Sequence, residues 1–146
     1  MIAQTIQLAL APVFVLVAIG NIMNILSSRL GRVVDRSRHL QDRYGQTSGH
    51  AHDMVVLEIR LIARRIVLIG RALTLLVVSG LTIGLTVGLL FFDEFVGLDL
   101  QRPAAGAFFV AIGLLMGALL IFLQETRIAA AALRIPADYL EPNRSI

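Results

Sequence analysis

Polar side chains gather on one face of the first apolar stretch of the chain, where they have the chemistry to line a path for water or ions. Asn21, Asn24 and Ser28 follow one another at intervals of three and four residues, so one face of a helix carries all of them. An asparagine inside a membrane is unfavourable unless it faces protein or water. The pattern indicates either a polar lining or hydrogen bonds between helices near a membrane boundary.

A second group of residues has the charge to bind anions, and it borders the apolar stretches. Its members are Arg29, Arg32, Arg64, Arg65, Arg71 and Glu125. An arginine near a membrane surface attracts an anionic lipid headgroup with about 1 kcal/mol. Glu125 is the acid best placed to form an ion pair with one of these arginines. We expect ion pairs and contacts with anionic lipid at one membrane surface, although arginines there also serve to set topology alone.

The sequence has little that points to metal binding or catalysis. His50, His52 and Asp53, with His39 as a fourth group, form a weak metal-ligand pattern, and a solvated turn is the better interpretation. The chain has no cysteine, and it contains no phosphate-binding loop, nucleophile elbow or zinc-protease motif. Its arginines lack the aromatic neighbours of a nucleic-acid site. We expect no enzyme, no cofactor or metal, and no nucleic-acid partner.

Three long apolar stretches must position these residues, at about 7–26, 72–92 and 107–123. Their lengths are close to the roughly 20 residues that a helix needs to cross a bilayer. The composition agrees, because 57% of the residues are hydrophobic and the mean hydropathy is +0.80. The sequence predicts an all-α membrane protein with three transmembrane helices, forming a single membrane domain over residues 1–146.

Basic residues are distributed unevenly around these stretches. Nine of the 13 basic residues lie between the first stretch and the second, whereas the short connection between the second and the third is mainly acidic. The positive-inside rule places arginine-rich loops in the cytoplasm. We expect an outside amino terminus and a cytoplasmic carboxyl terminus, with residues 124–146 forming a cytoplasmic helix and tail.

The arginine-rich segment also carries apolar residues at helical spacing. They recur at alternating intervals of four and three, which is the seven-residue pattern of packed helices. The first series is Leu26, Leu30, Val33, Leu40 and Tyr44, with Ser37 in its one polar position, and the second is Val55, Ile59, Ile62, Ile66, Ile69, Leu73 and Leu76. Residues 45–49 separate the two series as a turn. We expect spans one and two to extend into a cytoplasmic antiparallel helical hairpin over about 27–71.

The returning helix of this hairpin has a second apolar stripe, formed by Leu57, Leu61 and Leu68. Because positions 59 and 61 differ by about 200° around a helix, one partner helix cannot cover both stripes. A helix from another subunit would cover the second stripe, which predicts a homo-oligomer. Contact with the edge of the first helix, or with the helix after the third stretch, is the alternative.

Glycines at intervals of four residues predict close helix packing in the second and third stretches. They are Gly80, Gly84 and Gly88 in the second stretch and Gly113 and Gly117 in the third. In lipid, a glycine lets a neighbouring backbone approach closely. The sequence leaves open whether these glycines pack within one chain or between subunits.

One run of residues resembles a known family. The run from Asn21 to Arg38, which contains Ser-Arg-Leu-Gly-Arg-Val-Val-Asp-Arg-Ser-Arg at 28–38, is similar to a family of small bacterial integral membrane proteins known only as a domain of unknown function. The Arg64-Arg65 and Gln124-Glu125 pairs are similar to that family as well. The resemblance covers nearly the whole chain. It implies a bacterial cytoplasmic (inner) membrane and no particular activity. The order of the expected elements is also similar to that of the membrane-protein insertase superfamily, whose members have a polar groove open to the cytoplasm.

The best specific function for such a chain is a homo-oligomeric ion channel or pore lined by Asn21, Asn24 and Ser28. The alternative is a non-conducting scaffold or insertase-like factor whose cytoplasmic hairpin binds a protein partner. The oligomeric state separates the two, because a monomer excludes a central pore and a closed ring favours one.

Overall fold

Three long helices make up the described part of the chain. The computed structural model describes residues 2–133, which form α1 (Ile2–Tyr44), α2 (His50–Val96) and α3 (Gln101–Ala132). Each helix is long and apolar enough to cross a membrane. The predicted all-helical class is therefore confirmed, and the helices are compatible with a multi-pass membrane protein. Residues 134–146 of the predicted helix and tail at 124–146 lie outside the described residues.

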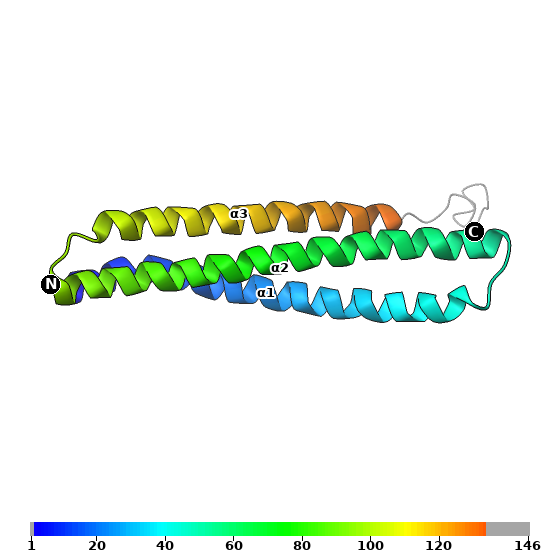
Figure 1. Cartoon of the computed structure of the whole chain (residues 1–146), viewed down its shortest axis with the longest axis horizontal. Helices are drawn as coiled ribbons and strands as arrows, with labels where there is room; N and C mark the ends of the chain where they lie inside the picture. The colour runs from blue at the N-terminus through cyan, green and yellow to red at the C-terminus, as the bar shows by residue number, and fades with distance from the viewer. Residues whose placement is uncertain (1, 134–146) are drawn as a thin grey trace, which may run out of the picture.

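The central helix of the bundle is α2 (Figure 1). It packs against α1 and against α3. Consecutive helices run in opposite directions, since short connections at 45–49 and 97–100 join them. Near the first of these connections, α1 and α2 extend past the end of α3 (Figure 1). The bundle is long and narrow as a result.

The core follows a seven-residue repeat in every helix. Its buried residues include Ile19, Leu26, Val33 and Leu40 of α1, Val55, Ile62, Ile69, Leu76 and Ile83 of α2, and Ala104, Ala111, Ala118 and Glu125 of α3. A step of seven keeps one line of side chains facing a neighbouring helix, as in coiled coils. The predicted apolar series around Leu26 and Ile62 form this core or pack against it and continue into the apolar stretches, except that Tyr44, at the end of the first series, is 50% exposed.

Small residues bring α3 close to α2. The core line of α3 consists of alanines until it reaches Glu125, and small side chains allow helix backbones to approach in lipid. Ser79 of α2 is fully buried, and its hydroxyl donates a 2.7 Å hydrogen bond to the backbone carbonyl of Ala111. A serine reaches the backbone of another helix only across a short gap, so this bond marks the closeness of the α2–α3 contact.

The connection between α2 and α3 is held by Asp93. Gly97 ends α2 with a φ of 68°, a conformation that glycine adopts without steric cost. Its N–H donates to the carbonyl oxygen of Asp93 at 2.8 Å, and the Asp93 carboxylate accepts from the N–H of Leu100 at 3.2 Å. These two bonds fix the short loop from which α3 starts back along α2.

Candidate functional site

A buried carboxylate joins all three helices where the apolar stretches end. The side chain of Glu125 on α3 is 0% exposed. Its Oε2 accepts a 2.7 Å hydrogen bond from Nη2 of Arg29 on α1, and its Oε1 accepts a 2.9 Å hydrogen bond from Nε of Arg65 on α2. We call these three residues the arginine–glutamate cluster. It is an ion-paired contact between α1 and α3, the two outer helices of the bundle.

The seven-residue repeat brings the members of this cluster together. Glu125 stands seven residues after Ala118, at the position where the repeat predicts another alanine. Arg29 lies three residues after the core residue Leu26, and Arg65 lies three residues after the core residue Ile62. Residues three apart share a helix face, so both arginines flank the core line of their helix. The same register that packs the apolar residues thus delivers both guanidinium groups to Glu125.

The electrostatics of the cluster leave it with excess positive charge. Two guanidinium groups meet one carboxylate, and charge-assisted hydrogen bonds offset the cost of burying it. The guanidinium of Arg29 also lies over the ring of Phe122, 5.3 Å from its centroid, in a cation–π arrangement. Arg29 Nε is buried, and no described residue accepts a hydrogen bond from it. The cluster has a free donor and a surplus of positive charge.

A cavity of about 680 Å³ adjoins the cluster, on the side away from the α2–α3 connection. We call it the basic cavity. Its charged lining consists of Arg29, Arg32, Arg36, Glu58 and Arg65. Its other walls are apolar and include Ile62 of α2 and Ala129 and Leu133 near the end of α3. One cavity therefore combines a cationic side with an apolar side.

The remaining charges of the basic cavity are only partly neutralised. Glu58 accepts a 2.8 Å hydrogen bond from Nε of Arg36, and its Oε1 lies 2.7 Å from Nη2 of the same arginine in an ion pair. Both side chains of this pair are well exposed, at 46% and 41%. Within residues 2–133, no carboxylate pairs with Arg32. Four arginines thus face two carboxylates, counting Glu125, and the cavity has two positive charges in excess.

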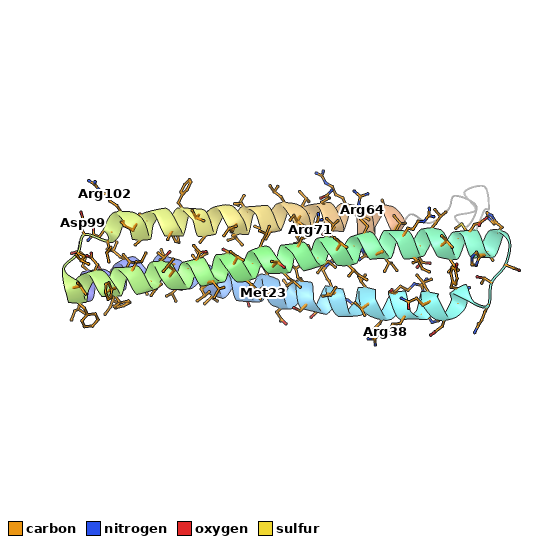
Figure 2. The ribbon with its side chains drawn as sticks, viewed as in Figure 1. Met23, Arg38, Arg64, Arg71, Asp99 and Arg102 are labelled. Carbon is orange, nitrogen blue, oxygen red and sulfur yellow. The ribbon has the colours of Figure 1, made fainter. Side chains whose placement is uncertain are left out.

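The opposite end of the apolar stretches has its own polar contact. Thr5 of α1 donates a 3.0 Å hydrogen bond to Oε2 of Glu94 on α2. About 36 Å of α1 separates Thr5 from Arg29 at 1.5 Å per residue, which exceeds the roughly 30 Å hydrocarbon core of a bilayer. The apolar stretches lie between these two polar levels. Figure 2 shows Arg38 and Arg64 in the half toward the 45–49 turn and Asp99 and Arg102 at the other end.

The other charged residues that the sequence singled out lie outside the cluster. Arg64 and Arg71 are exposed on α2. Arg71 lines a separate cavity of about 520 Å³, together with Thr74 and Ile121. Of the predicted inner-surface residues, the structure brings Arg29, Arg32, Arg65 and Glu125 to one place and leaves Arg64 and Arg71 apart.

The predicted pore-lining residues lie on the outer surface of the single chain. Asn21, Asn24 and Ser28 are all exposed. None of their side chains forms a hydrogen bond with another residue in the part of the chain that the structure describes. They are therefore available to water, lipid or a second protein.

The five glycines divide into two groups. A Cβ on Gly80 would lie 3.6 Å from Cδ1 of Leu16 on α1, and a Cβ on Gly117 would lie 3.5 Å from Cδ1 of Leu75 on α2. At Gly84, Gly88 and Gly113 a Cβ would meet no atom within 4 Å. Packing inside one chain accordingly does not account for these three glycines, because the contact between α2 and α3 runs along the alanine line instead.

The histidines at the 45–49 turn make local contacts. The ring of His52 lies 4.6 Å from the ring of Tyr44, centroid to centroid, and its Nδ1 is 3.4 Å from the hydroxyl of Thr47. The described residues include no group of three histidines or carboxylates placed to hold a metal. His52 instead helps to pack α1 against α2 at the turn.

Two features of the helix packing were not predicted from the sequence. One is the line of buried alanines on α3. Ala104, Ala111 and Ala118 follow one another at steps of seven, and the next step indicates that position 125 is also in the core. The other is the bond from Ser79 to the α3 backbone. The seven-residue spacing of the alanines could have predicted the alanine line. Nothing in the sequence distinguishes Ser79 from the serines and threonines whose hydroxyls bond within their own helix.

Comparison with known proteins places the chain in a family. A family model described as a protein of unknown function, DUF2721, matches residues 9–135. The chain belongs to this family. The match confirms the resemblance to a domain of unknown function and spans the arginine–glutamate cluster and most of all three helices. No curated protein and no solved structure matched the chain.

Proposed function

We propose that the chain is a subunit of a homo-oligomeric membrane protein that conducts ions. The arginine-rich half, in which α1 and α2 form a helical hairpin, stands in the cytoplasm, and the amino terminus and the 97–100 loop lie outside. The uneven distribution of arginines supports this orientation. A bacterial inner membrane is what the resemblance of residues 21–38 to small bacterial membrane proteins implies.

The observation that carries the proposal is the outward polar line of α1. Asn21 and Asn24 are exposed and lie inside the apolar stretch, where an amide without a partner costs several kcal/mol if it faces lipid. Water or another subunit removes that cost. A ring of chains with α1 toward its axis would turn these amides to water.

Liposome flux measurements test the proposal. The purified protein is reconstituted, and ion flux is followed under varied voltage, tension and pH. We expect flux for the wild type, and altered conductance for Asn21→Leu and Asn24→Leu. Ile25→Leu is a matched control, because Ile25 is also exposed on the same turn of α1 but is apolar. Absence of wild-type flux would refute conduction, and unchanged flux in both asparagine variants would remove α1 as the lining.

A second function, a non-conducting scaffold or insertase-like factor, has its own supporting observation. On the part of α2 beyond the apolar stretches, Met54, Leu57 and Leu61 are exposed. Apolar side chains in water favour a protein partner. A partner that co-purifies in fixed stoichiometry from native membrane, with no symmetric oligomer, would support this function over conduction. Replacing Leu57 and Leu61 by serine would then release the partner.

A further inference from the structure

We infer that the basic cavity binds the phosphate of an anionic phospholipid headgroup. The inference does not depend on ion conduction. It rests on the position of the cavity, its charge, a free buried donor and the apolar part of its lining.

The position of the cavity matches the height of a headgroup. Arg29 lies three residues after the end of the first apolar stretch, and Glu125 lies two residues after the end of the third. The cavity begins at Arg29 and Arg65, the two partners of Glu125, and extends along α1 and α2 away from the apolar stretches. A lipid beside the bundle would place its phosphate at this level, where the hydrocarbon core of the bilayer ends.

The charge of the cavity favours a phosphate over a neutral group. Its four arginines face two carboxylates, and Arg32 has no carboxylate partner among residues 2–133. Guanidinium groups match the geometry of phosphate oxygens and bind them with two hydrogen bonds each. Arg32 is exposed at the mouth of the cavity, so it can bind a phosphate without breaking an existing ion pair.

A buried donor inside the site lacks an acceptor. Nε of Arg29 is buried without a hydrogen-bond partner among the described residues, which is costly for a charged group. Nε has almost no solvent-accessible surface, so a phosphate oxygen would satisfy this donor only after the Arg29 side chain turns toward the cavity.

The apolar walls favour a lipid over free phosphate. Ile62, Ala129 and Leu133 offer no hydrogen bonds to an inorganic anion, but they can pack against the carbons of a headgroup that extends from the phosphate away from the bilayer. The volume of about 680 Å³ is large enough for a headgroup with its glycerol. We therefore assign the site to a phosphodiester that is attached to an apolar body.

Lipid titration of the full-length protein in neutral detergent tests this assignment. Binding of phosphatidylglycerol is measured by native mass spectrometry, with phosphatidylcholine and inorganic phosphate as separate arms. We expect the wild type to bind phosphatidylglycerol in preference to phosphatidylcholine, and millimolar inorganic phosphate to compete weakly. Arg32→Gln should weaken phosphatidylglycerol binding about fivefold, the factor that corresponds to one arginine at a membrane surface.

Two further variants locate the site. Arg38→Gln is the matched control, since Arg38 is an exposed arginine of α1 that points away from α2 (Figure 2) and is not part of the cavity lining. It should leave binding unchanged. Ala132→Glu places a carboxylate at the cavity edge and should abolish the preference for phosphatidylglycerol. Because Ala132 is exposed at the end of α3, this variant should fold normally.

Several results would overturn the assignment. Equal weakening by Arg32→Gln and Arg38→Gln would mean diffuse attraction to surface charge. Equal binding of the two lipids by the wild type would remove the anionic headgroup as the ligand. Full competition by inorganic phosphate at the same concentration as lipid would assign the cavity to a free anion.

Discussion

Arg29 on α1 and Glu125 on α3 form a 2.7 Å ion pair across 96 residues of sequence. The two helices each pack chiefly against α2, so this pair gives the outer helices a direct bond of their own. Arg65 adds the central helix to the same carboxylate. The buried side chain of Glu125 therefore links all three helices, and its removal should lower the free energy of unfolding.

Replacing Glu125 by alanine should destabilise the fold strongly. The change leaves two guanidinium groups without their carboxylate in a partly buried site, and loss of one partner of a buried ion pair costs about 3–5 kcal/mol. Reversible unfolding in mixed detergent micelles measures the effect. The exposed pair provides a matched control, since Glu58→Ala should cost at most about 1 kcal/mol.

Replacing the whole cluster should restore much of this stability. Methionine has a volume close to that of glutamate and arginine stems, and buried ion pairs exchanged for apolar residues are often neutral in stability. The triple variant Arg29→Met, Arg65→Met, Glu125→Met should unfold within about 2 kcal/mol of the wild type. A triple variant as unstable as Glu125→Ala would show that the site requires polar groups for folding.

The hydrogen bond from Ser79 to Ala111 should have a small, measurable effect. Interhelical hydrogen bonds in lipid contribute about 0.6 kcal/mol on average and up to about 1.7 kcal/mol, so Ser79→Ala should lower the free energy of unfolding by that amount. Thr82 is the matched control, because its hydroxyl bonds to the Val78 carbonyl of its own helix at 2.8 Å. If Thr82→Ala and Ser79→Ala have equal effects, the interhelical bond adds nothing.

Leucine at two of the glycines should separate folding from assembly. Gly117→Leu would drive its side chain into Leu75, which lies 3.5 Å from a Cβ at that position, and overpacking of this kind costs about 1–3 kcal/mol. Gly84→Leu meets no atom of its own chain within 4 Å. It should leave the free energy of unfolding unchanged and reduce the size of the oligomer in mild detergent. An unchanged oligomer would show that Gly84 faces lipid.

Core and surface leucines of α2 should differ in the same measurement. Leu76 is 0% exposed and Leu81 is 70% exposed. Leu76→Ala leaves a cavity in a packed interface and should cost about 2 kcal/mol or more. Leu81→Ala should change the free energy of unfolding by less than about 0.5 kcal/mol. A large effect at Leu81 would instead place it in an interface between subunits.

Much of the fold follows from periodicity in the sequence. The three apolar stretches and the series through Leu26 and Ile62 predicted long helices, because hydrophobic spacing reflects which face a helix buries. Glu125 was predicted to pair with an arginine, since its position after an apolar stretch puts it near the arginines that flank the others. The position of Glu125 in the sequence predicts an ion pair with an arginine, but it does not identify which arginine.

The remaining features could not be predicted, because they depend on how the three helices are placed relative to one another. The choice of Arg29 and Arg65 over Arg64 and Arg71 is set by the angular register of three helices, and one residue of shift turns a side chain by about 100°. The glycine spacing predicted close packing but not the neighbour, and only two of the five glycines meet a side chain of another helix. The free Nε of Arg29 arises from the precise pose of one guanidinium, which sequence patterns do not encode.

A seven-residue repeat that continues through all three helices is ambiguous about vertical alignment. Sliding α3 along α2 by one repeat, about 10 Å, would again set alanines against the α2 core line. The charged residues make both of these shifted alignments unfavourable. A shift of one repeat in one direction places Glu125 beside Glu58 instead of Arg65, and a shift in the other direction places it beside Ala72. The first slip opposes two carboxylates, and the second strands a buried charge. Glu125 thus restricts α3 to one of the several vertical alignments that apolar packing alone would allow.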